Sequence, residues 1–242
     1  MAFARPAEAS SPSTRLMVAG VADSLSGQWA NLLAPALAQA LHRPDFTLHT
    51  TTGWDGITGA NLFETQQEQV VPPAGLIVPG SAILAALCGD ARVHYDYQRW
   101  VPTFISHQPT VAIGRASVHR SLLSIINGRP LKVAVSSYTG AELPTLLGLD
   151  MLALRPLPLP GLGLPNSAIE ALRSGTVDVI QLPYDADYAE RLAMLQEEGF
   201  DPLFANASPK DPFLHKGLPP DFTTIYQQER KRLPNRLNYD LW

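Results

Sequence analysis

The chain has 242 residues, 45% of them hydrophobic, with a formal net charge of −4 and an isoelectric point near 5.8. This length suits one large domain or two small ones, and the acidic balance excludes the basic face that nucleic-acid binding needs. The single cysteine excludes an internal disulfide, and every apolar run is far shorter than the roughly 18 residues of a membrane-spanning helix.

The N-terminus is the first segment to interpret. Residues 1–14 are rich in proline, alanine and serine, and we expect them to be disordered. Ala2-Phe3-Ala4 has the small-x-small form that ends a signal peptide. We therefore expect an exported protein whose native signal peptide was cut away and replaced by Met1. The alternative is a cytoplasmic protein with a disordered start.

Strands alternate with helices along the first hundred residues. Short apolar strands are expected at residues 16–19, 45–49 and 75–78, and each is followed by a loop and a helical segment. After the second strand, glycines at 53, 56 and 59 leave the backbone accessible. This corner can direct free N–H groups at an anion, and the alternative is a tight surface turn.

A second unit of the same kind follows the aromatic segment 94–102. We predict strands at 110–113, 131–135, 152–154 and 176–180, and helices at 142–149, 166–172 and 186–198. The proline-rich residues 156–165 are predicted to form a loop. Strands that alternate with helices indicate an α/β sheet covered on both faces.

Several short motifs occur in a specific order. They are the glycine loop at 52–60, Tyr95-Asp96 with Trp100-Val101-Pro102, the strand and loop at 133–140, and residues 158–161 with 168–178. From residue 16 to about residue 225, this order resembles the solute-binding component of tripartite tricarboxylate transporters, a family of periplasmic carboxylate receptors. Two features differ. Residues 23–27 read Asp-Ser-Leu-Ser-Gly where the family has Gly-Gly-Ser-Thr-Asp, and the chain stops at Trp242 where family members continue.

The resemblance implies an α/β, two-lobed type II periplasmic-binding-protein-like fold with a ligand cleft between the lobes. We expect lobe one at residues 15–105 plus 206–242 and lobe two at residues 106–205. No enzyme activity is expected, because the histidines are scattered and no G-x-S-x-G elbow surrounds Ser136. No cofactor and no metal are expected.

The resemblance also implies a function. The chain is expected to bind a small organic acid in the periplasm and to deliver it to a membrane transporter permease or a sensor protein. We expect a monomer with no nucleic-acid partner. The altered loop at 23–27 favours an alternative, in which the chain is a ligand-free, binding-protein-like interaction module.

Ligand binding is predicted in the loops that join strands to helices. The loops at 22–26, 53–59, 78–81 and 136–141 contain no lysine or arginine, so backbone N–H groups, hydroxyls and helix dipoles must hold a carboxylate. Gly140 is expected to keep the approach open, so that Gly140→Val blocks binding and spares the fold unless this glycine needs a positive φ, in which case stability falls too. The predicted ligand-binding residues are Asp23, Ser24, Leu25, Ser26, Gly80, Ser81, Ser136, Ser137, Tyr138, Thr139, Gly140, Gly161 and Asp185.

Overall fold

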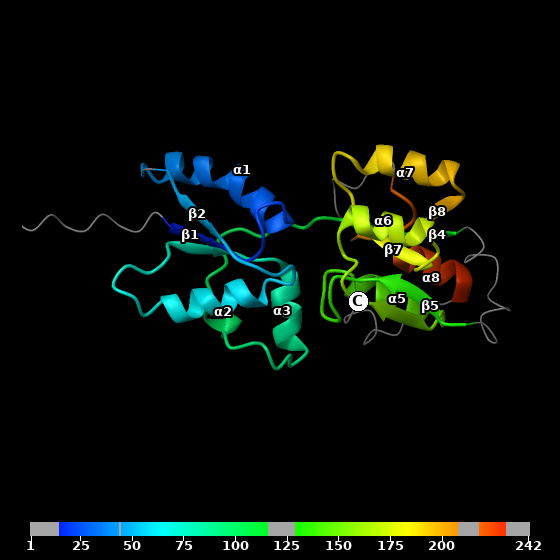
Figure 1. Cartoon of the computed structure of the whole chain (residues 1–242), viewed down its shortest axis with the longest axis horizontal. Coiled ribbons are helices and arrows are strands. Elements are labelled where there is room, and N and C mark those ends of the chain that lie inside the picture. Colours follow the sequence, from blue (N-terminus) through cyan, green and yellow to red (C-terminus); the bar gives the residue numbers. More distant parts are fainter. Residues whose placement is uncertain (1–14, 44, 116–128, 208–217, 231–242) are drawn as a thin grey trace, which may run out of the picture. The chain divides into compact units, whose positions relative to one another are not determined.

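The computed structural model describes residues 15–43, 45–115, 129–207 and 218–230 (Figure 1). The chain divides into two compact units, residues 1–101 and residues 102–242. The boundary lies four residues before the predicted end of lobe one. The predicted disorder of residues 1–14 lies outside the described residues.

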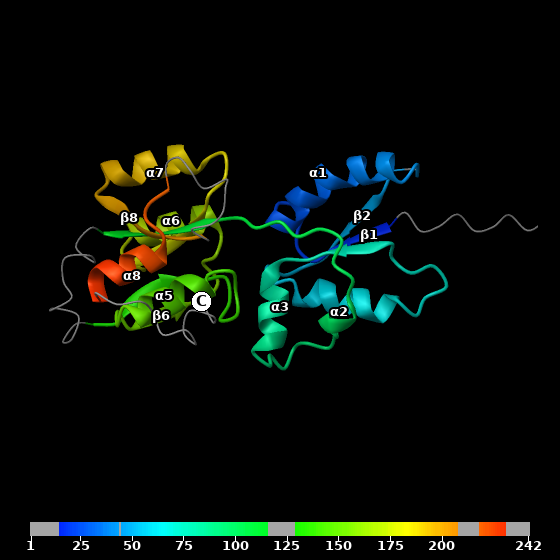
Figure 2. The same cartoon turned by 180° about the vertical axis from the view of Figure 1, so that it is seen from behind.

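Unit 1 is a three-stranded parallel sheet in the order β2-β1-β3, with helices on both faces. Its elements are β1 (Arg15–Val18), α1 (Leu25–Ala40), β2 (Thr47–Thr50), α2 (Ile57–Gln66), β3 (Gly75–Ile77), α3 (Gly80–Leu87) and a 3₁₀ turn (Tyr97–Arg99). The three strands confirm the sequence prediction. Figures 1 and 2 show α1 on one face of this sheet and α2 on the other.

Small side chains let α1 lie close to the sheet. Ala30, Ala34 and Ala38 recur every fourth residue and are buried, so one face of the helix contacts the strands. Met17 and Val18 of the central strand β1 are both fully buried, and since successive strand residues point to opposite faces, both faces of this sheet are covered there. The inner face is therefore marked by small residues, whereas Leu32, Leu37 and Leu41 of the same segment are exposed.

Unit 2 is a five-stranded mixed sheet in the order β6-β5-β7-β4-β8. β5 runs parallel to β6 and β7, whereas β4 runs antiparallel to β7 and β8. The elements are β4 (Thr110–Arg115), β5 (Leu131–Ala134), α5 (Leu143–Met151), β6 (Pro156–Leu159), α6 (Pro165–Arg173), β7 (Val179–Pro183), α7 (Tyr188–Glu197), β8 (Phe200–Asn206) and α8 (Phe222–Arg230).

Two hydrophobic cores cover the two faces of this sheet. Alternate residues of β5 separate between them, with Val133 and Val135 in the core under α5 and α8 and Ala134 in the core under α6 and α7. This separation follows from the two-residue period of a strand. Both faces are buried, which confirms the α/β class that the sequence predicts.

The strand predicted at residues 152–154 lies further along the chain. Residues 152–154 form a turn, in which Ala153 has a φ of 63°, and the strand is β6 at Pro156–Leu159, where a loop was predicted. β6 is an edge strand that pairs only with β5 among the described strands. Prolines two residues apart direct their nitrogens to the same side, so Pro156 and Pro158 fit a strand whose outer edge needs no N–H donors.

The C-terminal part of the chain also differs from the prediction, which placed residues 206–242 in lobe one. β8 pairs with β4 inside the unit 2 sheet. Phe222 on α8 is fully buried, and its ring lies 5.5 Å from the ring of Phe204 in an edge-to-face arrangement. The described residues from 206 to 230 therefore belong to unit 2, because aromatic packing holds α8 against that sheet. Residues 231–242 lie outside the described part.

No helix among the described residues is both long enough and apolar enough to cross a lipid bilayer.

Candidate functional site

The predicted loops of unit 1 lie together at one edge of its sheet. The three strands are parallel, so the loops that leave their carboxyl ends meet there. Thr51 connects two of these loops, because its hydroxyl donates to the carbonyl of Val18 (3.1 Å) and accepts from the N–H of Gly20 (3.2 Å). The buried hydroxyl of Ser81 connects a third, donating to the carbonyl oxygen of Asp55 at 3.0 Å.

The first loop uses its serine to begin a helix. The Ser24 hydroxyl accepts the N–H of Gly27 at 3.2 Å and donates to the carbonyl of Val21 at 2.6 Å, so it caps α1. Asp23 and Leu25 are exposed, and Ser26 is buried. The four predicted residues 23–26 thus lie where the first loop joins α1, and the hydroxyl of Ser24 is committed to the fold.

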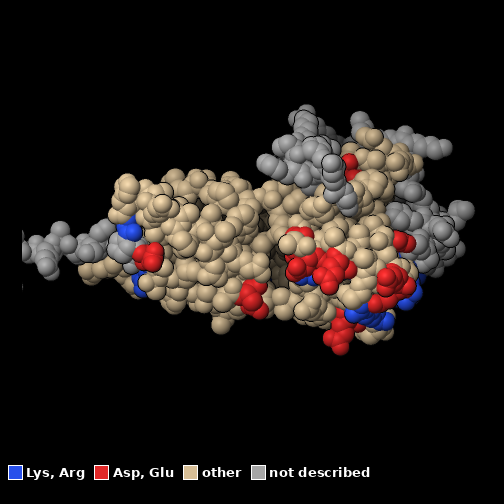
Figure 3. All heavy atoms as spheres, turned by 90° about the horizontal axis from the view of Figure 1, so that it is seen from above, with Lys and Arg blue, Asp and Glu red and all other residues tan. Residues whose placement is uncertain are grey.

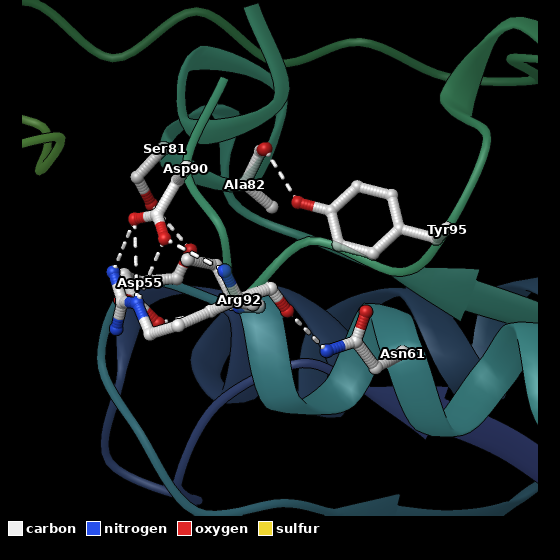
Figure 4. A network of polar contacts seen from close by, with 8 residues as sticks. Asp55, Asn61, Ser81, Ala82, Asp90, Arg92 and Tyr95 are labelled. Carbon is white, nitrogen blue, oxygen red and sulfur yellow. Dashed lines mark hydrogen bonds and ion pairs between the residues drawn. The ribbon is translucent and has the colours of Figure 1, made fainter. Parts of the chain in front are cut away.

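A side chain of the protein itself fills the glycine loop. Gly56, with a φ of 79°, precedes α2, and Asp55 accepts the N–H of Ile57 at 3.2 Å. The second oxygen of Asp55 pairs with Arg92 at 2.8 Å, and Asp55 is only 8% exposed (Figure 4). The corner therefore holds an anion, as the glycines suggested, but this anion is a carboxylate of the chain.

Arg92 extends this cluster, which we call the Asp55 network (Figure 4). Its guanidinium also pairs with Asp90 at 2.6 Å, and its hydrogen bonds lower the pKa of Asp90 to about 2. Asn61 on α2 donates to the carbonyl of Arg92 at 2.8 Å. Tyr95 donates to the carbonyl of Ala82 on α3 at 2.6 Å, and burial raises the Tyr95 pKa to about 12. The Asp55 network joins the glycine loop, α2, α3 and residues 90–95, which is a structural role.

The corresponding loop of unit 2 follows β5 and contains a second internal carboxylate. Both the N–H and the hydroxyl of Ser136 donate to Oε2 of Glu142, at 3.1 Å and 2.7 Å. Glu142 is 6% exposed, and burial raises the pKa of its carboxyl, although the Ser136 hydrogen bonds act in the opposite direction. We call these two residues the Ser136–Glu142 pair.

Sequence reasoning missed Glu142. A glutamate at the start of a helix needs no functional explanation, since acidic residues are favourable there. The signal that identifies it is a glutamate next to a serine-rich loop with no lysine or arginine in residues 133–149. A charge in that setting has only neutral groups of its own segment to pair with.

Two hydroxyls of the same loop have unused hydrogen-bonding capacity. Ser137 Oγ and Thr139 Oγ1 are buried, and neither has a hydrogen-bond partner within the described part of the chain. Tyr138 between them is 66% exposed. Buried polar atoms are normally paired, so unpaired hydroxyls at a loop indicate a place for water or a ligand.

Two glycines enclose the Ser136–Glu142 pair. A Cβ at Gly140 would collide with Ser136 Oγ and lie 2.5 Å from Glu142 Oε2, and a Cβ at Gly163 would lie 2.6 Å from Ser136 Cα. Gly140→Val would therefore displace the Ser136 hydroxyl or the Glu142 carboxylate, so it would alter this pair as well as the approach to the loop. Gly161, with a φ of 86°, has open space where a Cβ would lie, and its N–H donates to the Ser136 carbonyl at 3.3 Å.

A buried polar network supports the loop from below. Asn206 donates to Thr145 (2.7 Å), Gln181 (3.0 Å) and Thr110 (3.0 Å), while Gln181 donates to the carbonyl of Ala141 at 3.1 Å. Asn206 is 8% exposed, and its Oδ1 has no partner among the residues described. The network ties β4, β7, β8 and α5 to the loop, and sequence reasoning did not identify it.

The remaining predicted residues differ in their surroundings. Asp185 pairs with Arg191 at 3.0 Å and accepts the N–H of Asp187 at 3.2 Å, so its carboxylate is neutralised. Charged side chains gather over α7 in Figure 3, whereas the sixteen residues of α1 include none. Gly80, at the start of α3, has open space where a Cβ would lie. Within the described ranges, no group of three or more His, Cys, Asp or Glu side chains is arranged to hold a metal ion.

Comparisons with known proteins identify the fold. No protein-family model matches the sequence, and no curated protein sequence matches it. Among solved structures, the chain is similar to malate-bound MatC from Rhodopseudomonas palustris, with 18% identity and a TM-score of 0.56 over 84% of this chain and 69% of that chain. A TctC solute-binding protein from Polaromonas gives 17% identity and a TM-score of 0.54 over 82% and 67%.

A third similar structure is the periplasmic binding protein BugD, with 15% identity and a TM-score of 0.57 over 90% of this chain and 72% of that chain. These identities are low, so the likeness concerns the fold. The three structures and the two α/β units agree with the fold class predicted from the sequence. The chain has a periplasmic-binding-protein fold.

Proposed function

We propose that this chain is a periplasmic solute-binding protein for a small organic acid and a divergent member of the tripartite tricarboxylate receptor family. It binds rather than transforms its ligand, acts as a monomer, and delivers the ligand to a membrane transporter permease or a sensor protein. The order of motifs in the sequence supports this assignment. Similar structures whose names mention bound malate and bound adipate support the ligand class.

The observation that carries the proposal is the pair of unpartnered hydroxyls in the loop after β5. Ser137 and Thr139 point to a ligand that replaces water, because a buried hydroxyl without a partner is unfavourable. We propose that these hydroxyls hydrogen-bond to the ligand and that the exposed Tyr138 covers it. Ser26 and Gly80 in the unit 1 loops remain proposed ligand contacts. A cleft between the two lobes stays a prediction.

A thermal-shift screen of monocarboxylates, hydroxy acids, amino acids and dicarboxylates tests this function. An acid at about 100 times its dissociation constant should stabilise the protein by about 2.7 kcal/mol. Ser137→Ala combined with Thr139→Val should abolish the shift. Ser174→Ala is the matched control, because its hydroxyl bonds to Ala171 and Thr176 after α6, outside this loop.

A second function has one observation in its favour. Asp55 and Glu142, carboxylates of the chain, occupy two loops that were predicted to hold a ligand anion. A chain that fills its own anion positions fits a ligand-free interaction module. If no acid shifts the unfolding temperature, and the double variant unfolds at the same temperature as the wild type with or without acids, this second function replaces the first.

A further inference from the structure

The Ser136–Glu142 pair changes what the loop after β5 accepts. A strand end with a free N–H and a free hydroxyl is a suitable place for an anion. Here both donors of Ser136 already bond to Glu142 Oε2. A second carboxylate at this loop would have to compete with one that is part of the chain.

Packing keeps the Glu142 carboxylate against the loop that carries Ser137 and Thr139. The point where a Cβ of Gly140 would lie is 2.5 Å from Glu142 Oε2 and 3.1 Å from the backbone nitrogen of Ser137. Glu142 and Ser137 therefore face the same small space. Because Gly163 is in close contact with the backbone of Ser136, the pair has little room to separate.

The segment that carries Glu142 supplies no neutralising charge. Residues 133–149 contain no lysine, arginine or histidine, and no described ion pair involves Glu142. Like charges a few ångströms apart in a partly buried site repel strongly. A hydroxyl or amide of a ligand meets no such penalty, because Ser137 and Thr139 can each donate or accept a hydrogen bond.

We infer that Glu142 determines specificity: it excludes a second carboxylate from the loop at 136–140, so the ligand is a monocarboxylate that presents an uncharged polar group to Ser137 and Thr139. This inference rests on the proposed function and narrows its ligand class. The carboxylate of such a ligand is held away from this loop. Hydroxy acids and related monoanions with a neutral polar end fit this description.

Matched ligands separate the charge from the shape. Calorimetric titration at pH 7.5 would compare 4-hydroxybutanoate with succinate, 5-hydroxypentanoate with glutarate, and 6-hydroxyhexanoate with adipate. In at least one pair the wild type should bind the hydroxy acid at least about tenfold more tightly than the dicarboxylate. The repulsion between nearby carboxylates costs more free energy than a tenfold difference in affinity represents. This ratio needs no variant, so it stays informative if a variant fails to fold.

Glu142→Gln then tests the residue itself. An amide oxygen can still accept from Ser136, so the shape of the loop is kept while the charge is removed. In this variant the dicarboxylate should gain about tenfold in affinity. Glu170→Gln, on the exposed face of α6, is the control and should leave both affinities unchanged.

The outcomes are distinct. If in every pair that binds the wild type takes the dicarboxylate as tightly as its hydroxy acid partner or more tightly, or if Glu142→Gln folds and leaves the ratio unchanged, the inference fails and the proposed function stands. If neither protein binds any acid, the proposed function fails and the inference with it.

Discussion

The two units each place a carboxylate of the chain in a loop that joins a strand to a helix, but they surround it differently. In unit 1, Asp55 accepts the N–H of Ile57 and pairs with the guanidinium of Arg92. In unit 2, Glu142 accepts from the N–H and hydroxyl of Ser136 and has no partner of opposite charge among the ion pairs described. One carboxylate has a cation as its partner, whereas the other has neutral donors.

This difference indicates that the loop around Asp55 is structural and that the loop after β5 is available for binding. The Asp55 network joins four segments, and the guanidinium of Arg92 pairs with both of its carboxylates. In unit 2, the Glu142 carboxylate has no cation among the described ion pairs, and two hydroxyls of the same loop have no partner among the residues described. A site in which charge and hydrogen-bonding capacity are both unused is a better candidate for ligand recognition than a closed ion-pair network.

The largest expected effect comes from the packing of the unit 2 loop. Gly163→Ala places a Cβ 2.6 Å from Ser136 Cα and 2.7 Å from Ser136 N, and backbone atoms cannot move aside easily. We expect the free energy of unfolding of unit 2 to fall by about 3 kcal/mol, measured by urea denaturation. Gly80→Ala in unit 1 has open space and should change stability by less than about 0.5 kcal/mol. Equal effects would contradict the tight packing of this loop.

The next effect concerns unit 1. Asp55→Ala removes the acceptor of the Ile57 N–H and one partner of Arg92, whose side chain is 57% exposed and keeps Asp90. We expect a loss of about 2 kcal/mol, mainly from the lost buried hydrogen bond to the Ile57 N–H, because the ion pair is partly screened by solvent. Amide hydrogen exchange should accelerate in α2 and α3 and stay unchanged in unit 2.

Glu64→Ala is the matched control for Asp55→Ala. Glu64 pairs with Arg99 at 3.1 Å in an exposed setting, so its removal should change stability by less than about 1 kcal/mol. If Glu64→Ala destabilises unit 1 as much as Asp55→Ala does, the Asp55 network has no special structural role.

Local sequence patterns were sufficient for some elements and insufficient for others. β1, β3 and β5 were predicted correctly because each is a short apolar run bounded by glycine, proline or serine. β6 was missed because its prolines are compatible with a strand only at a sheet edge, and an edge is a property of the whole sheet. The unit to which α8 belongs depends on the contact of Phe222 with Phe204, which no local pattern predicts.

The candidate site divides in the same way. The sequence identified the loop at 136–141, because a loop after a strand and before a helix is a common binding position. It did not identify Glu142 as the buried partner of Ser136, since burial of a charge is decided by the packing of Gly140 and Gly163 around it. The sequence also could not predict which hydroxyls lack a partner among the described residues. Ser24, Ser81 and Ser136 differ from Ser137 only in the groups that the fold places next to them.

The smallest effect tests the charge state of Glu142 directly. Burial raises its pKa in the folded protein above the value in the unfolded chain. The folded state therefore holds the Glu142 proton at a pH where the unfolded state has lost it, and this contribution to stability disappears as the pH rises through the folded pKa. Glutamine has no proton to lose, so Glu142→Gln should become progressively more stable than the wild type from pH 4 to pH 8.

Few other titratable groups affect this measurement locally. The loop at 136–141 adds only Tyr138, α5 adds only Asp150 near its other end, and neither β7 nor residues 160–164 contain a titratable residue.

Glu198→Gln gives the opposite sign, because the hydrogen bond from Arg173 lowers the pKa of Glu198. At pH 8 the wild type should be slightly more stable than Glu198→Gln, by a small margin because the pair is exposed. This difference in stability should vanish as the pH falls. Urea denaturation at five pH values would measure both differences. If the free energy of unfolding of Glu142→Gln changes with pH in parallel with that of the wild type, Glu142 titrates alike in the folded and unfolded chain. The two units would then differ in how their loops are packed and not in the charge of their carboxylates.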